Sequence, residues 1–273
     1  YRPKKINFKK TYKMKYLNLF LFLFLLSNVF SQDYDLFDKE LFVFENDTLN
    51  YRILRPLNFD PNKQYPVHLF LHGAGERGDD NSSQLIHGGK LFLKKEKREK
   101  YNSWVIFRQC SKNDRWPSLS SDIWNKPFQN KMDKSNKSMG LVLKLMDVFI
   151  EKKEVNKQKI YVSGLSMGGM GTFEILSRRP NMFAAATPIC GNGIPELAKL
   201  YADKVSLWIF HGSNDMVVSP IHSLKMATAI IESGGSPKFT LFEDTGHDSW
   251  NNAFAEKDFL RWIHSKSKEN KLK

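Results

Sequence analysis

IYVSGLSMGGMG, residues 160–171, is the stretch of sequence that decides the fold. Its first three residues are apolar and β-branched or aromatic, which is typical of a short buried strand. The pattern Gly-x-Ser-x-Gly follows at 164–168, and a helical pattern then runs to Arg179, where Pro180 ends it. A serine at such a tight strand-to-helix turn presents its hydroxyl to solvent. We therefore predict that Ser166 is a nucleophile.

Apolar segments alternate with helical segments on both sides of this stretch. A hairpin is expected first, from Leu41–Glu45 and Leu49–Leu54 around Asn46-Asp47. The remaining predicted strands are Val67–Leu71, Trp104–Phe107, Ile160–Val162, Ala184–Ile189, Leu207–Phe210 and Phe239–Phe242. Helices are expected over about 85–100, over 138–153 with Ser138 as its cap, after Ser166, and over 253–265. This alternation predicts one domain with a mostly parallel sheet covered by helices on both faces.

The N-terminus has the composition of a targeting segment. Lys15 follows a plausible start at Met14, an apolar run extends from Leu17 to Leu26, and Ser31 is a suitable last residue before cleavage. This order predicts a secretory signal peptide within an N-terminal extension of residues 1–31, and a secreted or periplasmic protein. An uncleaved membrane anchor is the alternative, although an apolar run of about ten residues is shorter than the about 20 that span a bilayer. We expect no stable membrane anchor after cleavage.

Charge says little about partners. The formal net charge is +13, but residues 1–31 hold seven basic residues and no acidic one, which leaves a net charge of +6 for the rest. No nucleic-acid-binding motif accompanies the lysines, so we expect no nucleic-acid partner. We also expect no cofactor and no metal ion, because no metal-ligand spacing, phosphate loop or dinucleotide fingerprint is present. The predicted domain covers residues 32–265, and residues 266–273 form a basic tail.

Two polar residues follow neighbouring strands late in the chain. Asp215 comes after Leu207–Phe210, and His247 comes after Phe239–Phe242. Because the carboxyl ends of parallel strands meet at one edge of a sheet, both side chains should lie near Ser166. A serine hydroxyl needs a base to become nucleophilic, and the base needs an orienting acid. We predict His247 as the general base and Asp215 as the acid.

Other residues compete for these roles. Asp244 is the main alternative to Asp215, whereas Asp248 adjoins His247 and should point away from the site. Three further histidines are expected to be structural or to cap helices: His72, His211 and His222.

Backbone donors for a developing oxyanion are predicted at two places. The N–H of Met167, at the start of the helix, is one candidate. The glycine-rich run His72-Gly-Ala-Gly-Glu-Arg-Gly78 follows an earlier strand at the same sheet edge. Its Ala74 or Gly75 would supply the second donor, and the sequence does not separate the two.

These motifs together resemble the α/β-hydrolases, and within them the bacterial group described as predicted peptidases, which are similar to feruloyl and acetylxylan carbohydrate esterases and to polyhydroxybutyrate-depolymerase-like esterases. The resemblance covers about residues 40–265. The matching segments are Leu71–Gly78, Asn81, Gln84-Leu85, Gln109-Cys110, Gly164–Gly169, Pro188–Gly191, His211-Gly212 with Asp215, and Gly246–Trp250. One departure is Ser111-Lys112-Asn113, where a proline would be expected near the pocket. The resemblance implies the α/β-hydrolase fold and a serine hydrolase that uses Ser166, His247 and Asp215.

The fold that the resemblance implies also bears on the two cysteines. Cys110 and Cys190 would end strands that are separated by two others. Neighbouring strands lie ~4.8 Å apart, so the two thiols would be about 14 Å apart, beyond disulfide distance. We predict two free, buried thiols.

The predicted loops near the site limit the range of substrates that we expect. Only a short segment separates Cys190 from Leu207, so we expect no large cap over the site. Trp116, Trp124 and Trp250 are candidates to stack on a sugar or an aromatic acyl group, or else they pack the loops onto the sheet. We predict hydrolysis of carboxyl esters, with acyl groups on polysaccharides as the favoured class. A serine peptidase and a non-catalytic binding module are the alternatives.

Overall fold

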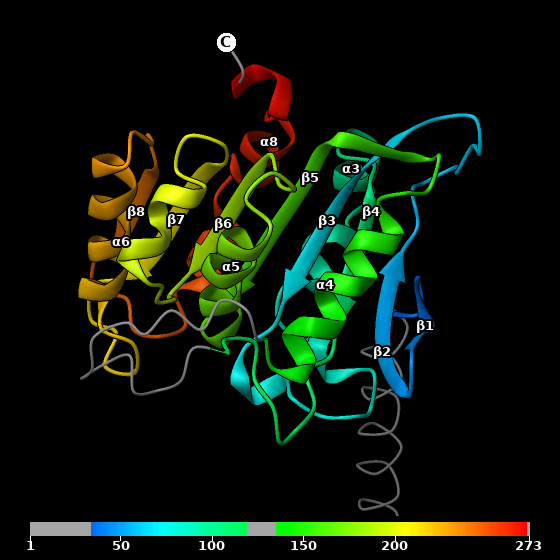
Figure 1. Cartoon of the computed structure of the whole chain (residues 1–273), viewed down its shortest axis with the longest axis horizontal. Coiled ribbons are helices and arrows are strands. Elements are labelled where there is room, and N and C mark those ends of the chain that lie inside the picture. Colours follow the sequence, from blue (N-terminus) through cyan, green and yellow to red (C-terminus); the bar gives the residue numbers. More distant parts are fainter. Residues whose placement is uncertain (1–33, 119–134, 272–273) are drawn as a thin grey trace, which may run out of the picture. The chain divides into compact units, whose positions relative to one another are not determined.

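The computed structural model describes residues 34–118 and 135–271. The chain divides into two compact units, residues 1–36 and 37–273, and the second carries the fold (Figure 1). Two sequence predictions, the signal peptide in residues 1–31 and the role of Trp124, lie outside the described residues. None of the helices in the described ranges is long and apolar enough to cross a membrane.

An eight-stranded sheet forms the centre of the second unit, in the order β1-β2-β4-β3-β5-β6-β7-β8. Its strands are β1 (Phe37–Phe44), β2 (Asp47–Leu54), β3 (Tyr65–Leu71), β4 (Trp104–Arg108), β5 (Val155–Leu165), β6 (Ala185–Ile189), β7 (Ser206–Gly212) and β8 (Lys238–Phe242). β3 to β8 run parallel, while β1 and β2 form an antiparallel hairpin that pairs antiparallel with β4. The predicted α/β-hydrolase fold class, with its N-terminal hairpin, is confirmed.

Helices cover both faces of this sheet, as Figure 1 shows. One face packs against α4 (Lys137–Phe149), α5 (Met167–Arg178) and α6 (Pro220–Glu232). The other face packs against α2 (Gly89–Leu93), α7 (Trp250–Ala255) and α8 (Phe259–His264), and α3 (Lys95–Lys100) follows α2.

Alternate residues of β3 explain why both faces are apolar. Leu69 and Leu71 belong to the core under α4 and α5, whereas Phe70 contacts Phe254 of α7 with ring centroids 5.9 Å apart. Successive side chains of a strand point to opposite faces, so a strand that is buried on both sides reads as an unbroken apolar run. This is why β3 was recognisable in the sequence.

Two predicted helices are each divided in two. The helix expected over 85–100 is a 3₁₀ turn (Ser83–Leu85) followed by α2 and α3, which are separated at Lys94 with its extended ψ of 125°. The helix expected over 253–265 begins earlier and is interrupted at Glu256. This interruption lets Phe254 contact β3 while Phe259 contacts Phe210 of β7.

The cap of α4 differs from the prediction as well. The Asn136 side chain accepts a hydrogen bond from the Met139 N–H at 2.9 Å, so Asn136 and not Ser138 is the N-cap. Ser138 lies inside the helix, where its own N–H donates to the Asp114 carboxylate.

Both cysteines are free and buried, as predicted. Cys110 follows β4 and Cys190 follows β6, with β3 and β5 between these two strands. Between Cys190 and β7 the chain forms only the short 3₁₀ helix Pro195–Leu200, so this connection carries no cap domain.

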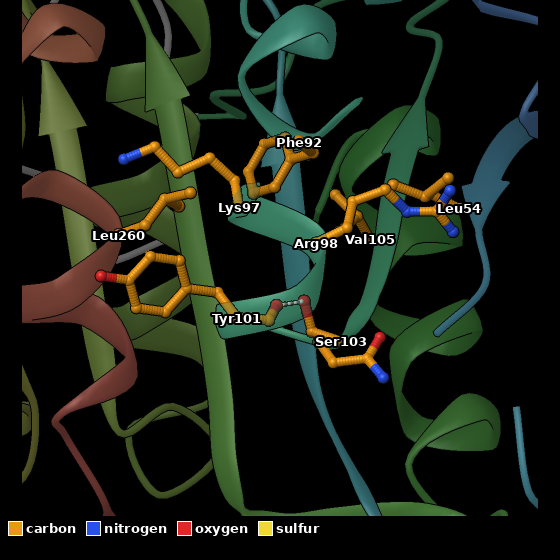
Figure 2. Close-up of a pocket in the computed structure, with 9 residues that line it drawn as sticks. Leu54, Phe92, Lys97, Arg98, Tyr101, Ser103, Val105 and Leu260 are labelled. Atoms are coloured by element: carbon orange, nitrogen blue, oxygen red, sulfur yellow. Dashed lines mark hydrogen bonds between the residues drawn. The ribbon is translucent and has the colours of Figure 1, made fainter. Parts of the chain in front are cut away.

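A small pocket lies at the amino end of β4, and Figure 2 shows its lining. Its walls come from β2, α2, α3, β4 and α8, and from Tyr101–Ser103 just before β4. Parallel sheets of this kind build their sites beyond the carboxyl ends of the strands. The functional site is therefore expected at the opposite edge of the sheet.

Candidate active site

Ser166 lies between the last residue of β5 and the first residue of α5. Its φ of 52° and ψ of −118° are a strained conformation for a residue with a side chain. A Cβ atom at Gly164 would overlap the Gly168 carbonyl, and one at Gly168 would overlap the Leu71 carbonyl. Close contact therefore requires glycine at both positions. The turn places Ser166 Oγ at the carboxyl edge of the sheet.

The side chains of Ser166, His247 and Asp215 form a continuous chain of hydrogen bonds. Ser166 Oγ lies 2.9 Å from His247 Nε2. On the other side of the ring, His247 Nδ1 lies 2.7 Å from Asp215 Oδ2. The structure thus brings together the three residues that the sequence predicted for catalysis.

The loop after β7, which carries Asp215, packs directly against the loop after β8, which carries His247. A Cβ atom at Gly212, the last residue of β7, would overlap the carbonyls of Thr245 and Gly246. The Asn214 N–H also donates to the Thr245 carbonyl at 2.9 Å. The acid and the base are therefore positioned by direct contact between the segments that carry them.

Asp215 is held as a carboxylate. Its side chain is fully buried, and its Oδ1 accepts the N–H groups of Val217 at 2.8 Å and Val218 at 2.9 Å. Burial alone would raise the pKa of Asp215, but the hydrogen bonds from His247 and these N–H groups outweigh burial and hold the pKa below 3.8. A carboxylate only accepts, so His247 Nδ1 carries the proton and Nε2 is free to accept the proton of Ser166.

His211 lies behind the acid and was not singled out by the sequence for catalysis. Its Nε2 lies 2.8 Å from the Val218 carbonyl and 3.3 Å from Asp215 Oδ2. Its Nδ1 lies 2.7 Å from Ser223 Oγ of α6. Burial lowers the pKa of His211, so the ring is neutral and its Nε2–H points at the carbonyl and the carboxylate. These bonds agree with the structural role expected of it and add a contact with the acid. The only sequence signal for this contact is its spacing, four residues before Asp215.

The alternative acids lie elsewhere. Asp244 is exposed, and its Oδ1 accepts from the Asn214 amide at 3.3 Å. Asp248 is exposed as well and bonds Asn251. Neither carboxylate bonds His247, so the geometry favours Asp215 over Asp244.

The predicted oxyanion donors flank Ser166. Met167 is the first residue of α5, and Ala74 and Gly75 begin the 3₁₀ turn Ala74–Glu76. This turn is close to the serine, because a Cβ atom built on Gly73 would lie 3.7 Å from Ser166 Cβ. Backbone N–H groups on both sides of the hydroxyl suit an oxyanion hole. Ala74 and Gly75 remain equal candidates for the second donor.

The histidine below this turn supports it. His72 is fully buried, its Nδ1 lies 2.6 Å from the Gly73 carbonyl, and its Nε2 accepts from the Cys110 N–H at 2.8 Å. Burial lowers the pKa of His72 to about 4, so the ring is neutral. The structural role predicted for His72 therefore agrees with its contacts, which tie the turn after β3 to the end of β4.

Two of the three candidate tryptophans lie in the described residues, and they differ from each other. Trp116 is fully buried, and its Nε1–H donates to the His72 carbonyl at 2.7 Å. It has no face for a substrate, so the predicted stacking role is wrong for Trp116, which packs its loop onto the sheet. Trp250 is partly exposed, and its ring meets that of His247 edge-on with centroids 5.5 Å apart. Of these two candidates, Trp250 is the one that a substrate at His247 can reach.

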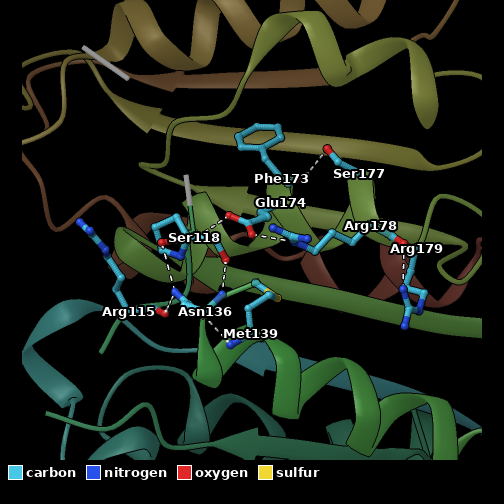
Figure 3. A network of polar contacts seen from close by, with 10 residues as sticks. Arg115, Ser118, Asn136, Met139, Phe173, Glu174, Ser177, Arg178 and Arg179 are labelled. Atoms are coloured by element: carbon cyan, nitrogen blue, oxygen red, sulfur yellow. Dashed lines mark hydrogen bonds and ion pairs between the residues drawn. The ribbon is translucent and has the colours of Figure 1, made fainter. Parts of the chain in front are cut away.

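A buried ion pair fixes the loop after β4 to the nucleophile helix (Figure 3). Glu174 and Arg178 of α5 are 2.8 Å apart, with side chains only 3% and 5% exposed. The other oxygen of Glu174 accepts the Ser118 N–H at 2.7 Å. On the far side of Ser118, its Oγ accepts the Asn136 N–H at 2.8 Å. This network joins residue 118 to the start of α4 beside the candidate site.

Comparison with solved structures gives the same fold. The chain is similar to a thermostable esterase with a TM-score of 0.77 and 28% identity, over 86% of this chain and 64% of that one. It is also similar to a ferulic acid esterase from Anaeromyces mucronatus, with a TM-score of 0.61 and 15% identity over 84% of this chain and 90% of that one. An acylaminoacyl peptidase from Pyrococcus horikoshii matches with a TM-score of 0.63 and 15% identity over 90% of this chain and 45% of that one. At such low identity, the last two matches bear on the fold alone.

Sequence comparisons identify the family. A bifunctional acetylxylan esterase/xylanase from Neocallimastix patriciarum is 31% identical over 78 residues, which are 29% of this chain and only 12% of that protein. The model of the phospholipase/carboxylesterase family matches residues 60–264, a span that includes Ser166, Asp215 and His247. The protein is therefore an esterase-type α/β-hydrolase of the phospholipase/carboxylesterase family.

Proposed function

We propose that this protein hydrolyses carboxyl esters through an acyl-enzyme intermediate on Ser166. The observation that carries this proposal is the hydrogen-bonded chain from Ser166 Oγ through the His247 ring to Asp215. A serine hydroxyl is a weak nucleophile on its own, and it is activated by a base within hydrogen-bond reach. The 2.9 Å between Oγ and Nε2 satisfies that condition.

The reaction proceeds in two halves. His247 Nε2 takes the Ser166 proton as Oγ attacks the ester carbonyl, and Asp215 stabilises the imidazolium that forms. The N–H of Met167 and that of Ala74 or Gly75 bind the oxyanion of the tetrahedral intermediate. His247 then gives its proton to the leaving alcohol. Water repeats the sequence on the acyl-enzyme and releases the acid.

The substrate class that we propose is an acylated polysaccharide outside the cell. The relatives favour it, since they include a protein named for acetylxylan esterase activity and one named for ferulic acid esterase activity. The signal-like sequence of residues 1–31 favours export. Trp250, partly exposed against the His247 ring, is suited to stack on a sugar or an aromatic acyl group at the site.

A panel of esters tests the proposal. Purified protein should hydrolyse nitrophenyl acetate, and should hydrolyse acetylated or feruloylated xylo-oligosaccharides with a higher kcat/KM. Ser166→Ala should lower kcat by about 10⁴-fold or more. A fluorophosphonate should label the wild type and not this variant. If the wild type neither labels nor turns over any ester, the proposal is wrong, and a binding module becomes the better description.

A serine peptidase is the alternative that the panel separates. Acyl transfer from an amide uses the same residues, and an acylaminoacyl peptidase shares the fold. Efficient cleavage of short peptide amides, with negligible turnover of esters, would favour the peptidase.

A further inference from the structure

A buried thiol, Cys190, lies beside the catalytic acid and base. Among the described residues, Cys190, Asp215 and His247 each offer a ligand atom, and these atoms all lie within 4.8 Å of one another. Cys190 follows β6, Asp215 follows β7 and His247 follows β8. The three groups therefore converge from the ends of three adjacent strands, and no sequence spacing reveals them. This is why the sequence predicted no metal site.

A fourth donor lies beside the thiol. The Ser249 hydroxyl follows His247 by two residues and lies near the Cys190 thiol. Ser249 is fully buried, and its Oγ has no hydrogen-bond partner among the described residues. A buried hydroxyl without a partner is uncommon and costs free energy, so it points to a ligand that the cluster can accept.

The nature of the donors selects the ligand. A sulfur, an imidazole nitrogen and a carboxylate oxygen are the set that Zn²⁺ and similar thiophilic divalent cations prefer. A hydroxyl or a water would complete four-coordinate geometry. Calcium and magnesium prefer oxygen ligands alone and would be excluded by the sulfur.

We propose that Cys190, Asp215 and His247 form an inhibitory site for a thiophilic divalent cation such as Zn²⁺ or Cd²⁺. Burial raises the pKa of the Cys190 thiol to about 12, so the metal-free protein holds it as S–H. On binding, the S–H bond breaks, its proton leaves to solvent, and a metal–sulfur bond forms without any change of oxidation state. The cation also receives a lone pair from His247 and an oxygen of Asp215.

Inhibition follows from the single lone pair of a neutral imidazole. Whichever ring nitrogen binds the cation, the other nitrogen carries the proton. His247 then has no acceptor for the Ser166 proton. This consequence for activity rests on the proposed function, whereas the binding itself does not. The His247 side chain is 20% exposed while the Asp215 side chain is fully buried, so the cation would enter past the histidine ring.

The chain offers a matched control because it contains only two cysteines. Cys110 is buried and free like Cys190, but it lies on the other side of β3 and β5. In Cys110→Ser, any Cd–thiolate bond can come only from Cys190. This variant assigns the sulfur even if substitutions of Cys190 prevent folding.

The experiment titrates the full chain with Cd²⁺ and follows the ultraviolet charge-transfer band of the Cd–thiolate bond. Wild type and Cys110→Ser should each bind one Cd²⁺ per chain, and Cys190→Ala should bind at least about 100-fold more weakly. Zn²⁺ should block fluorophosphonate labelling of the wild type and of Cys110→Ser, and a chelator should restore it. Labelling of Cys190→Ala should resist the same Zn²⁺ concentration.

Three results would overturn the inference. The first is a wild type without a stoichiometric Cd–thiolate band, and the second is a band that disappears in Cys110→Ser. The third is equal Zn²⁺ inhibition of wild type and Cys190→Ala. A protein that gives the band in Cys110→Ser but never labels with a fluorophosphonate would contradict the proposed function and leave the metal site standing.

Discussion

Around Ser166 the backbone leaves no room for side chains, whereas around Asp215 and His247 side-chain hydrogen bonds hold the backbone. The first region depends on glycines whose Cβ atoms would collide with carbonyl groups. The second depends on Oδ1 of Asp215 accepting two N–H groups and on its Oδ2 accepting from His247. The first arrangement depends on shape, and its steric contacts between glycines and carbonyl groups do not change with pH. The second depends on protonation states, so the two regions should fail under different perturbations.

The largest expected effect is on the hydrogen-bonded region. In Asp215→Asn, the amide oxygen would stay on the N–H groups of Val217 and Val218, and the NH₂ would face His247 Nδ1. The ring would then carry its proton on Nε2, where it cannot accept from Ser166. We expect kcat to fall about 10⁴-fold.

The matched control for this change is Asp244→Asn. Asp244 is exposed, and its hydrogen bond among the described residues is with Asn214. The kcat of Asp244→Asn should therefore stay within about twofold of the wild-type value. A small loss of kcat in Asp215→Asn together with a large loss of kcat in Asp244→Asn would show that Asp244, and not Asp215, orients His247.

Next in size is a test of the glycine-packed region. In Gly168→Ala, the new methyl would overlap the carbonyls of Leu71 and His72. Neither backbone can move without disturbing the sheet, so unfolding free energy should fall by more than about 3 kcal/mol. In Gly75→Ala the methyl would meet nothing within 4 Å, and stability should change by less than about 0.5 kcal/mol. Urea denaturation measures both, and equal effects would contradict the steric account.

A smaller effect concerns the pH dependence of stability near Ser166, where His72 ties the turn after β3 to the end of β4. Burial, together with the nearby cations Arg108 and Arg77, lowers the pKa of His72 from 6.5 to about 4. A charged ring would also lose the hydrogen bond that its Nε2 accepts from the Cys110 N–H. The unfolded chain therefore binds more protons between these values. The contribution of neutral His72 to stability is complete above pH 6.5 and is lost as pH falls toward 4.

We expect this one group to cost about 2 kcal/mol of unfolding free energy between pH 7 and pH 5. In His72→Gln, the decrease in stability over this interval should be smaller by that amount, whatever the absolute stability of the variant. Urea midpoints at the two pH values provide the measurement. Parallel curves for variant and wild type would show that His72 titrates normally in the fold.

The smallest expected effect comes from the histidine behind the acid. His211→Phe keeps a ring but removes the Nε2–H that faces the Val218 carbonyl and Asp215, so Asp215 should be held less firmly. We expect kcat to fall about 10-fold, equivalent to about 1.4 kcal/mol. His211→Gln restores a donor and should recover part of the loss. As a comparison, His222→Phe, at a partly exposed position of α6, should retain activity.

The contrast between the two regions also explains what the sequence could predict. Steric packing leaves a trace in sequence because only glycine satisfies it, and Gly164 and Gly168 therefore identified the turn. Buried strands such as β3 were recognisable because both faces are apolar. The order of Ser166, Asp215 and His247 along the chain completed the prediction of the catalytic residues.

Contacts between distant side chains left no such trace. The role of His211 depends on its contacts with Ser223 and Val218. The position of Trp116 depends on its hydrogen bond to His72. The local sequence specifies neither set of contacts. The cap of α4 was misassigned because Asn136 and Ser138 are both good capping residues, and only the start of the first turn decides between them. The breaks at Lys94 and Glu256 have no proline or glycine to mark them, so the local sequence does not reveal them.

The collision of any Cβ at Gly164 or Gly168 with neighbouring carbonyls has a consequence for evolution and for design. Selection cannot improve this turn by gradual substitution, since any amino acid that replaces either glycine brings a Cβ atom into a neighbouring carbonyl group. The loops that carry Asp215 and His247 have no comparable restriction at most positions. New specificities should therefore arise by varying residues 213–218 and 243–250 with Asp215 and His247 kept unchanged, and a mutational library confined to those segments would retain far more folded members than one spread over the turn.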